Sequence, residues 1–390
     1  MKTKLLLWGI AVILSSATVQ AQNEPDLNEL LNRLDENHMG SVTDVFTSEE
    51  MSVLRTHFDA LYPPQEIPLQ EGGGDEVFAP ENVNGNFGHF SSGAPDVFNI
   101  IGASGTADFD GAGTFDPNTG LFFLIDNANN VYVVDPVSGL YSNLGTVTPP
   151  AGESFTGLEF DPSSGNMYGI STDGAGSSTI SIIDPVSLTV TPIGNTGITL
   201  AIALAVDAVG ALYTFDIDLD QAFRINAATG VATLLGALGF DASFGQGMFL
   251  NSATGEIFLT AFNNGAFRSE FRSLNTTTGA TTLLGPIGST SPGGTLQFGW
   301  SSLNTVTFGV SDTGLEQVQL FPNPVENQLQ LSSTKVIDEA VIYDLQGKEL
   351  KRISIGVSQD RIDVSHLNSG LYIVSVRVEG SIGSYRFIKN

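Results

Sequence analysis

Asp116-Pro117-Asn118-Thr119-Gly120 is the stretch that decides the fold, because the same kind of turn returns at a fixed interval. Asp161-Pro162-Ser163-Ser164-Gly165 follows 45 residues later, and degenerate copies at Asp207–Gly210 and Asn251–Gly255 follow after 46 and 44 residues. In each copy an Asp or Asn starts the turn and a Gly supplies the positive φ that closes it. The constant interval indicates a repeat protein.

Two further landmarks divide each repeat. A second turn, first seen at Asp135–Gly139, comes 19 to 24 residues after the first one, and an apolar residue followed by Gly, first seen at Leu144-Gly145, closes each unit. Runs of β-branched, aromatic and other apolar residues such as Leu121–Ile125 and Val131–Val134 lie between these landmarks. Four short strands in about 45 residues are the spacing of a propeller blade.

The two ends of the array are incomplete in complementary ways. Val97–Gly102 resembles the last strand of a unit, whereas Leu296–Trp300 and Val306–Val310 resemble the first pair of strands. An N-terminal strand that completes the last blade would close a ring and remove its edges. The sequence therefore predicts an all-β fold, a five-bladed β-propeller over residues 96–312 with four full blades and one composite blade. A jelly roll or sandwich is the alternative.

The N-terminus has the features of a signal peptide. Lys2 and Lys4 precede an apolar run, Leu5–Leu14, and small residues follow up to Ala21. This run is shorter than the roughly 20 residues that a transmembrane helix needs. We therefore expect residues 1–21 to be removed on export and no transmembrane span in the mature chain.

Residues 22–64 are expected to be helical and residues 65–95 to be a linker. Leucines at helical spacing lie between Leu27 and Leu34, and a second helix is predicted to start at Thr47 with Glu50 as its capping-box partner. Its apolar stripe consists of Met51, Leu54, Phe58 and Leu61, and Pro63-Pro64 ends it. The following segment, 65–95, is rich in Gly, Pro, Asn and acidic residues, which is typical of a linker.

The charge balance excludes one large class of partners. The formal net charge is −27, and residues 22–315 contain 33 acidic residues against five arginines and no lysine. Such a field repels phosphate backbones, so nucleic-acid binding is excluded, whereas cations or a basic partner would be attracted. The chain has no cysteine, so the exported protein must fold without disulfides.

The histidines limit the chemistry that the repeats can perform. His38, His57 and His89 precede the expected propeller and His366 follows it. A Ser-His-Asp triad or a histidine-based zinc site within the array is therefore not expected. A pair of carboxylates could still act as a glycosidase, so a carbohydrate-active enzyme remains the alternative to a binding or adhesion protein.

The expected blade topology assigns function to one face. The uniform Asp-Pro-type turns lie on one side, and the variable loops on the opposite side are the usual location of binding sites. Acidic residues with interleaved aromatics on these loops would suit an extracellular glycan or protein. The ligand-binding candidates are Asp108, Asp110, Glu153, Asp218, Asp220 and Asp241. Asp216, Asp218 and Asp220 would share one face of a strand and are the candidate ligands for Ca²⁺, the one cofactor considered.

The last 75 residues, from Glu316, differ from the array because their nine acidic and eight basic residues nearly balance. They contain four motifs in this order: Phe321-Pro322-Asn323-Pro324, Val341–Lys348, Asp363–Tyr372 and Phe387–Asn390. This order of motifs resembles the type A C-terminal sorting domain found in cargo of the type IX secretion system of Bacteroidetes-type bacteria.

The resemblance implies a small β-sandwich over residues 316–390 and a route of export. It implies Sec-dependent passage to the periplasm, then secretion or attachment to the outer-membrane surface. Its implied partners are the type IX secretion machinery and a sortase-like peptidase. In the family pattern, two prolines mark entry into the sandwich, a Gly-Lys pair forms a hairpin turn, a Gly and a Tyr mark the penultimate strand, and a Lys belongs to the terminal signal. The matching residues are Pro322, Asn323, Pro324, Gly347, Lys348, Gly370, Tyr372 and Lys389.

Overall fold

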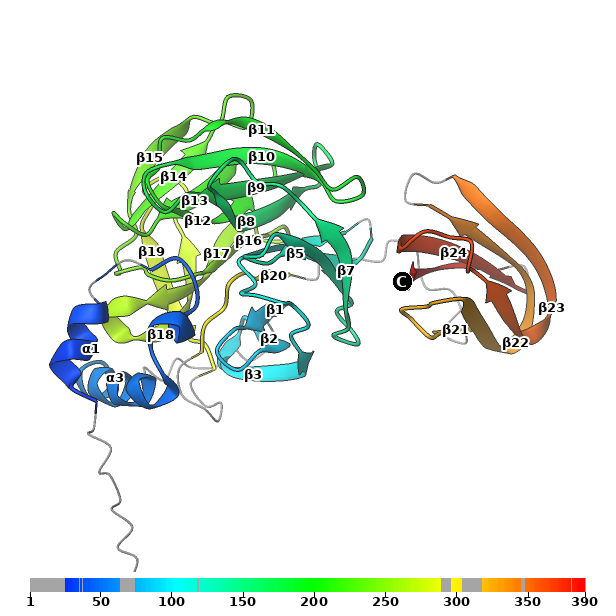
Figure 1. Cartoon of the computed structure of the whole chain (residues 1–390), viewed down its shortest axis with the longest axis horizontal. Helices are drawn as coiled ribbons and strands as arrows, with labels where there is room; N and C mark the ends of the chain where they lie inside the picture. Colours follow the sequence, from blue (N-terminus) through cyan, green and yellow to red (C-terminus); the bar gives the residue numbers. More distant parts are fainter. Residues whose placement is uncertain are drawn as a thin grey trace, which may run out of the picture.

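The computed structural model describes residues 25–34, 36, 38–63, 74–117, 119–288, 296–303, 318–344, 348–379 and 381–389. The expected signal peptide (1–21), the expected strand Val306–Val310 and the turn residue Gly347 lie outside these ranges. In the described part, five four-stranded sheets form a β-propeller, and a separate β-domain follows it in the sequence (Figure 1). No helix in these ranges is long and apolar enough to cross a membrane.

The repeats form four consecutive blades, each an antiparallel meander of four strands. The first blade contains β4 (Ala112–Asp116), β5 (Leu121–Ile125), β6 (Asn130–Val134) and β7 (Tyr141–Thr146). The second contains β8 (Ser154–Asp161), β9 (Asn166–Thr172), β10 (Ser178–Asp184) and β11 (Thr189–Asn195). The third contains β12 (Ala201–Val206), β13 (Leu212–Asp216), β14 (Gln221–Ile225) and β15 (Ala232–Ala237). The fourth contains β16 (Gly247–Asn251), β17 (Glu256–Asn263), β18 (Arg268–Leu274) and β19 (Thr281–Pro286). The prediction of four full blades is confirmed.

The fifth blade is composite, but its strands differ from those predicted. Their spatial order is β20 (Ser302–Leu303), β1 (Glu76–Glu81), β2 (Asn86–Ser91) and β3 (Ala94–Ala103). The predicted strand Val97–Gly102 lies within β3, whereas Phe298 forms only an isolated bridge, with Glu81.

The linker interpretation is therefore wrong for residues 76–91, which form β1 and β2. The Asn- and Gly-rich segment between them is a tight turn, in which the Glu81 carboxylate accepts the backbone N–H of Val83 at 2.9 Å. Phe87 and Phe90 on β2 are fully buried. The polar residues of this turn made the whole segment resemble a linker, although the strands on either side of it contribute apolar side chains to the blade.

The innermost strands of the five blades close a ring around the propeller axis. β20 contacts β4, and the contacts continue through β8, β12 and β16 back to β20. Two glycines permit this close approach: a Cβ added at Gly113 would lie 2.5 Å from Trp300 Cε2, and one added at Gly157 would lie 2.6 Å from the backbone nitrogen of Leu204. Because real Cβ atoms do not come that close to neighbouring atoms, larger residues at these positions would push adjacent blades apart.

The propeller has two different faces. The turns between first and second strands and between third and fourth strands lie on one side, here called the short-turn face. Gly120 and Gly165 close two of these turns with φ of 64° and 75°, as the Asp-Pro-x-x-Gly pattern predicts. The second-to-third turns and the connections between blades lie on the other side, here called the long-loop face. This separation follows from the antiparallel order of each sheet.

The N-terminal residues form three helices that pack against the fourth blade (Figure 1). They are α1 (Leu27–Leu34), α2 (Val42–Val45) and α3 (Ser48–Leu61), and a short 3-10 helix, η1 (Asn264–Ala266), lies in the loop that they cover. Thr47 and Glu50 form the predicted capping box of α3. Met51, Leu54 and Phe58 are buried as expected, whereas Leu61, at the end of the helix, is 56% exposed.

The C-terminal domain has its own apolar core. Its strands are β21 (Val318–Phe321), β22 (Gln328–Tyr343), β23 (Glu349–Asp363), β24 (Gly370–Val378) and β25 (Ser381–Lys389). β22 changes register after Ser332, so that its first half pairs with β21 and its second half with β24. This bend folds the sheet into the expected small sandwich around a core that includes Leu329, Ile342 and Phe387.

Candidate ligand-binding face

All six candidate carboxylates lie on the long-loop face, but they do not converge. Asp108 and Asp110 belong to the connection between β3 and β4, Glu153 precedes β8, and Asp241 precedes β16. Asp218 and Asp220 lie in the turn between β13 and β14. The six residues are thus distributed over the first three blades and the connection that leads into the fourth.

Two of the six candidates are buried within the propeller. Glu153 accepts hydrogen bonds from the hydroxyls of Ser171 at 2.6 Å and Thr179 at 2.7 Å, so its carboxylate joins neighbouring strands of the second blade. Asp110 is fully buried, and its Oδ2 accepts a hydrogen bond from Ser104 Oγ at 3.0 Å. Burial raises the pKa of Asp110 to about 7. Both carboxylates therefore face the protein interior rather than a ligand.

The other four candidates reach solvent to different degrees. Asp108, Asp218 and Asp241 are exposed, and Asp220 is half-buried. Asp220 adopts a left-handed conformation, and its Oδ1 accepts the backbone N–H of Ala242 at 2.7 Å. Burial raises the pKa of Asp220 to about 6, and the nearby charges of Asp241 and Asp216 act in the same direction.

The strand geometry on which the calcium hypothesis depended is not observed. β13 ends at Asp216, and the next four residues form a turn. Asp216 is buried, and its Oδ1 accepts the backbone N–H of Asp218 at 2.8 Å, so this carboxylate closes the turn. Among the described residues, no three His, Cys, Asp or Glu side chains are arranged to hold a metal ion.

Because residues 76–91 form strands of the composite blade, one histidine lies within the propeller. His89 lies on β2, where its ring pairs with the Glu76 carboxylate of β1 and lies 5.5 Å from the ring of Phe78. The expectation that the propeller contains no histidine is therefore wrong. These contacts place the imidazole in a cross-strand pair on the composite blade.

The N-terminal segment 38–45 crosses the long-loop face, which the sequence analysis did not predict. Gln297 holds this segment: its Oε1 accepts the Val42 N–H at 2.7 Å, and its Nε2 donates to the Gly40 carbonyl at 2.9 Å. The Gly40 carbonyl also accepts the N–H of Gly245 at 3.0 Å. Ser41 and Asp44 form a capping box for α2, and this Ser-x-x-Asp spacing is the sequence signal that could have revealed the turn.

Aromatic packing fixes the helices that carry this segment. Phe46 meets Phe267 edge-on with ring centroids 5.9 Å apart, and Phe58 stacks on the same ring at 6.2 Å. Asn264 donates to the carbonyl of Leu34 at 2.9 Å, so polar contacts reinforce the apolar ones. Because these rings are buried, the N-terminal helices belong to the folded propeller domain.

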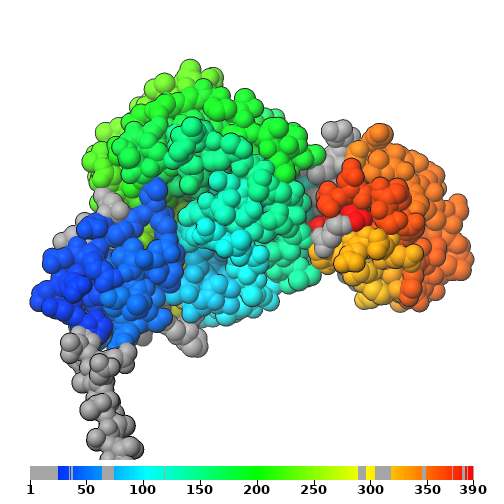
Figure 2. Space-filling model, viewed as in Figure 1, coloured from blue at the N-terminus to red at the C-terminus, as the bar shows by residue number. Residues whose placement is uncertain are grey.

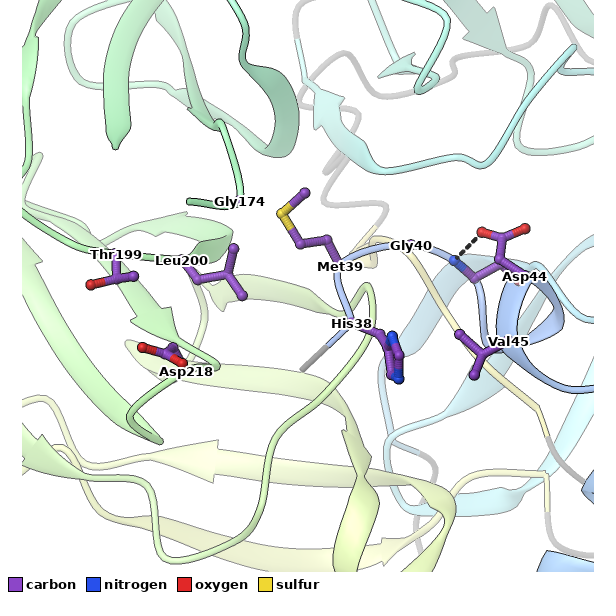
Figure 3. Close-up of a pocket in the computed structure, with 10 residues that line it drawn as sticks. His38, Met39, Gly40, Asp44, Val45, Gly174, Thr199, Leu200 and Asp218 are labelled. Atoms are coloured by element: carbon purple, nitrogen blue, oxygen red, sulfur yellow. Dashed lines mark hydrogen bonds between the residues drawn. The ribbon is translucent and has the colours of Figure 1, made fainter. Parts of the chain in front are cut away.

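A cavity of about 320 Å³ lies between segment 38–45 and the second and third blades. Figure 3 shows Thr199 and Asp218 on one side of it and His38 and Asp44 on the other, with Met39 between them. A second cavity, of about 260 Å³, lies on the other side of the segment and is lined by Asp44, Asp108 and Phe109. Asp44 lines both cavities and was not among the predicted candidates.

The cavities contain few aromatic surfaces. Phe109 is half-buried, whereas Phe155 and Phe244, which also belong to this face, are fully buried. Phe240 is covered by the Arg272 guanidinium, 4.3 Å above its ring. Most of the aromatic side chains that are interleaved with the loop acids, and that would have stacked on a glycan, are therefore buried in the core. By contrast, Asp44, Asp108 and Asp218 lie along the cavity walls.

The sequence of the C-terminal domain matches a known family. Residues 319–390 match the family described as the secretion system C-terminal sorting domain. In the structure, the backbone N–H of Asp344 donates to the Lys348 carbonyl at 3.1 Å, Gly370 begins β24, and Lys389 ends β25. No curated protein matches the chain in sequence.

Solved structures with a similar fold are distant. PorZ, described as an essential surface component of the type-IX secretion system of Porphyromonas gingivalis, is 15% identical with a TM-score of 0.30, over 83% of this chain and 53% of that one. A protein of unknown function from Bacteroides caccae is 14% identical with a TM-score of 0.36, over 74% of this chain and 99% of that one. A chain in a nidogen/laminin complex is 12% identical with a TM-score of 0.40, over 73% of this chain and 96% of that one. The chain thus spans about half the length of PorZ. Residues 319–390 are a type IX secretion sorting domain, and the chain is a protein secreted to the cell surface or the extracellular space.

Proposed function

We propose that this is a secreted or cell-surface binding protein whose long-loop face recognises a basic group, such as a lysine or arginine side chain, of an extracellular protein. The observation that supports this proposal is the cavity with Asp44 and Asp218 on opposite walls. A cation between two carboxylates gains attraction from both, and a cavity wall reduces the screening by solvent.

The composition of the domain favours the same class of ligand. Residues 22–315 contain 33 acidic and five basic residues, so the long-range field attracts cations toward the whole domain and would speed their association. The burial of Phe155 and Phe244 leaves little aromatic surface for sugar stacking, and for this reason we favour a basic protein over a neutral glycan.

The test is a titration of the full mature chain with an oligo-lysine peptide, with a neutral peptide of equal length and neutral oligosaccharides as alternatives. Asp218→Asn and Asp44→Asn should each weaken oligo-lysine binding about two- to fivefold, the value of one partly exposed charge contact. Glu256→Gln, an equal change of charge at an exposed position on the short-turn face, is the matched control and should have little effect. Equal binding of both peptides, or equal losses in all three variants, would contradict the proposal.

The second candidate function is a carbohydrate-active enzyme, and one observation favours it. Asp220 has a pKa raised to about 6, which suits a general acid near neutral pH, and Asp218 lies on the same turn. Hydrolysis of a polysaccharide that is lost in Asp220→Asn but retained in Asp241→Asn would replace the binding proposal with this one.

A further inference from the structure

The terminal strand β25 of the sorting domain has two covered faces. Phe387 points into the core of the sorting domain, where its ring stacks on Tyr372 at a centroid distance of 5.6 Å. Because side chains alternate along a strand, Arg386 and Ile388 point to the opposite face. Ile388 is nevertheless only 3% exposed. A surface outside the core of the sorting domain therefore covers this side of the strand.

The covering surface is the first blade of the propeller. Ile388 belongs to the same apolar cluster as Leu121 and Phe123 of β5. The Arg386 guanidinium lies against the turn between β4 and β5, since a Cβ added at Gly120 would lie 2.6 Å from Arg386 Cζ. Figure 2 shows the C-terminal strand, in red, on the side of the sorting domain that is nearest to the propeller.

The charges at this contact are complementary. Burial lowers the pKa of the half-buried Arg386 guanidinium. The negative charges of Asp116 and Asp135, which start the two short turns of the first blade, act in the opposite direction and favour its protonated form. A half-buried cation beside two carboxylates and an apolar neighbour has the composition of a specific contact rather than of a chance encounter.

Equivalent turns in other blades do not make this contact. Gly165 and Gly255 close the corresponding turns of the second and fourth blades, and a Cβ added at either of them would have no atom within 4 Å. The three turns have the same backbone form, with φ of 64°, 75° and 75° at the glycine. The turn of the first blade therefore has the same backbone form as the other two turns and differs from them in its contact with Arg386.

We propose that the short-turn face of the first blade is an intramolecular docking site for β25, and that docking covers the terminal strand of the sorting domain in the intact chain. Arg386 and Ile388 are the two anchors, one ionic and one apolar. A partner that binds this side of β25 then has to displace the first blade. Loss of the sorting domain would in turn expose a patch formed by Asp116, Leu121 and Asp135.

The glycines provide a matched test in the full chain. The flexible end of the Arg386 side chain can move away from a methyl group, so a large replacement is needed to block the contact. Gly120→Trp and Gly165→Trp carry a similar backbone cost, because both glycines have positive φ, but only the first places a bulky side chain in the space that Arg386 occupies. Small-angle scattering should show a compact wild-type chain, an increased radius of gyration for Gly120→Trp, and no increase for Gly165→Trp. A wild-type chain that already scatters as two separated domains would overturn the proposal.

Charge reversal provides an independent test. Arg386→Glu places a third carboxylate beside Asp116 and Asp135 and should separate the domains, with faster amide exchange in residues 116–121. Arg361→Glu makes the same charge change at an exposed position on β23 and should behave like the wild type. Unchanged amide protection of β22 and β24 would show that the variant sorting domain is folded. Wild-type scattering and exchange in a folded Arg386→Glu chain would refute the docking site.

Discussion

Replacing Gln297 by Ala should release the N-terminal segment from the long-loop face. Gln297 is fully buried and makes three hydrogen bonds, to the Val42 N–H at 2.7 Å, the Gly40 carbonyl at 2.9 Å and the Gly245 carbonyl at 3.2 Å. The substitution removes all three and leaves the N–H of Val42, itself a fully buried residue, without this acceptor. An unsatisfied buried donor costs about 1–3 kcal/mol, and each lost bond about 1 kcal/mol more.

Part of that cost will be relieved when the segment moves or water enters, so we expect a net loss of about 2–3 kcal/mol in the free energy of local opening. Amide exchange in residues 38–45 should then become roughly 30- to 150-fold faster, at about tenfold for each 1.4 kcal/mol. Hydrogen–deuterium exchange of the full chain measures this directly. The same variant should bind the oligo-lysine probe more weakly, because segment 38–45 forms one wall of the cavity.

Gln246→Ala is the control for Gln297→Ala. Gln246 is equally buried and lies next to Gly245, but the hydrogen bond of its side chain goes to the Ser243 carbonyl at 2.9 Å. The Gln246→Ala variant should therefore leave the amide exchange of residues 38–45 near the wild-type rate. Wild-type protection of residues 38–45 in Gln297→Ala, or equal acceleration in both variants, would show that Gln297 does not hold the segment.

Three further predictions test the composite blade, the buried acid and the terminal strand. A chain starting at Gly93 lacks β1 and β2 and should melt at a much lower temperature than one starting at Gly74; equal melting temperatures would argue against the composite blade. Burial raises the pKa of Asp110 from 3.8 to about 7, so its carboxyl group holds a proton more tightly in the folded protein than in the unfolded chain. This contribution to the free energy of unfolding is present at low pH and is lost as the pH rises from about 4 to 7. Asp110→Asn should flatten that decline in denaturation midpoints, and an unchanged pH profile would assign it to other groups. Deletion of residues 387–390 removes the buried Phe387 and the end of the sorting domain, so the protein should accumulate in the periplasm; normal amounts at the cell surface in fractionation would contradict the role of this strand.

The repeat period was enough to predict the propeller, because it records a local property. Each Asp-Pro-type turn satisfies its own hydrogen bonds, as when Asp161 accepts the N–H of Ser163 at 2.8 Å, so the turn residues recur wherever the chain reverses. The composite blade lacks this signal. Its β1–β2 turn uses Glu81 and Asn84 in place of Asp-Pro, and two strands were therefore taken for a linker.

The sequence was enough to place the candidate acids on one face of the propeller, the long-loop face, but not to predict which way each carboxylate points. Glu153, Asp216 and Asp218 are all acidic residues next to or within variable loops, yet in the structure hydroxyls donate to the Glu153 carboxylate and a backbone N–H donates to that of Asp216. Asp44, on a wall of both cavities, comes from a helix outside the repeats. It reaches the face because Val42 bonds to Gln297, a residue 255 positions away in the sequence. A site that depends on such a contact leaves no local pattern in the sequence, because the residues around Val42 do not depend on those around Gln297. The acidic composition of the loops can be read from the sequence, whereas the position of Asp44 beside them depends on this long-range contact.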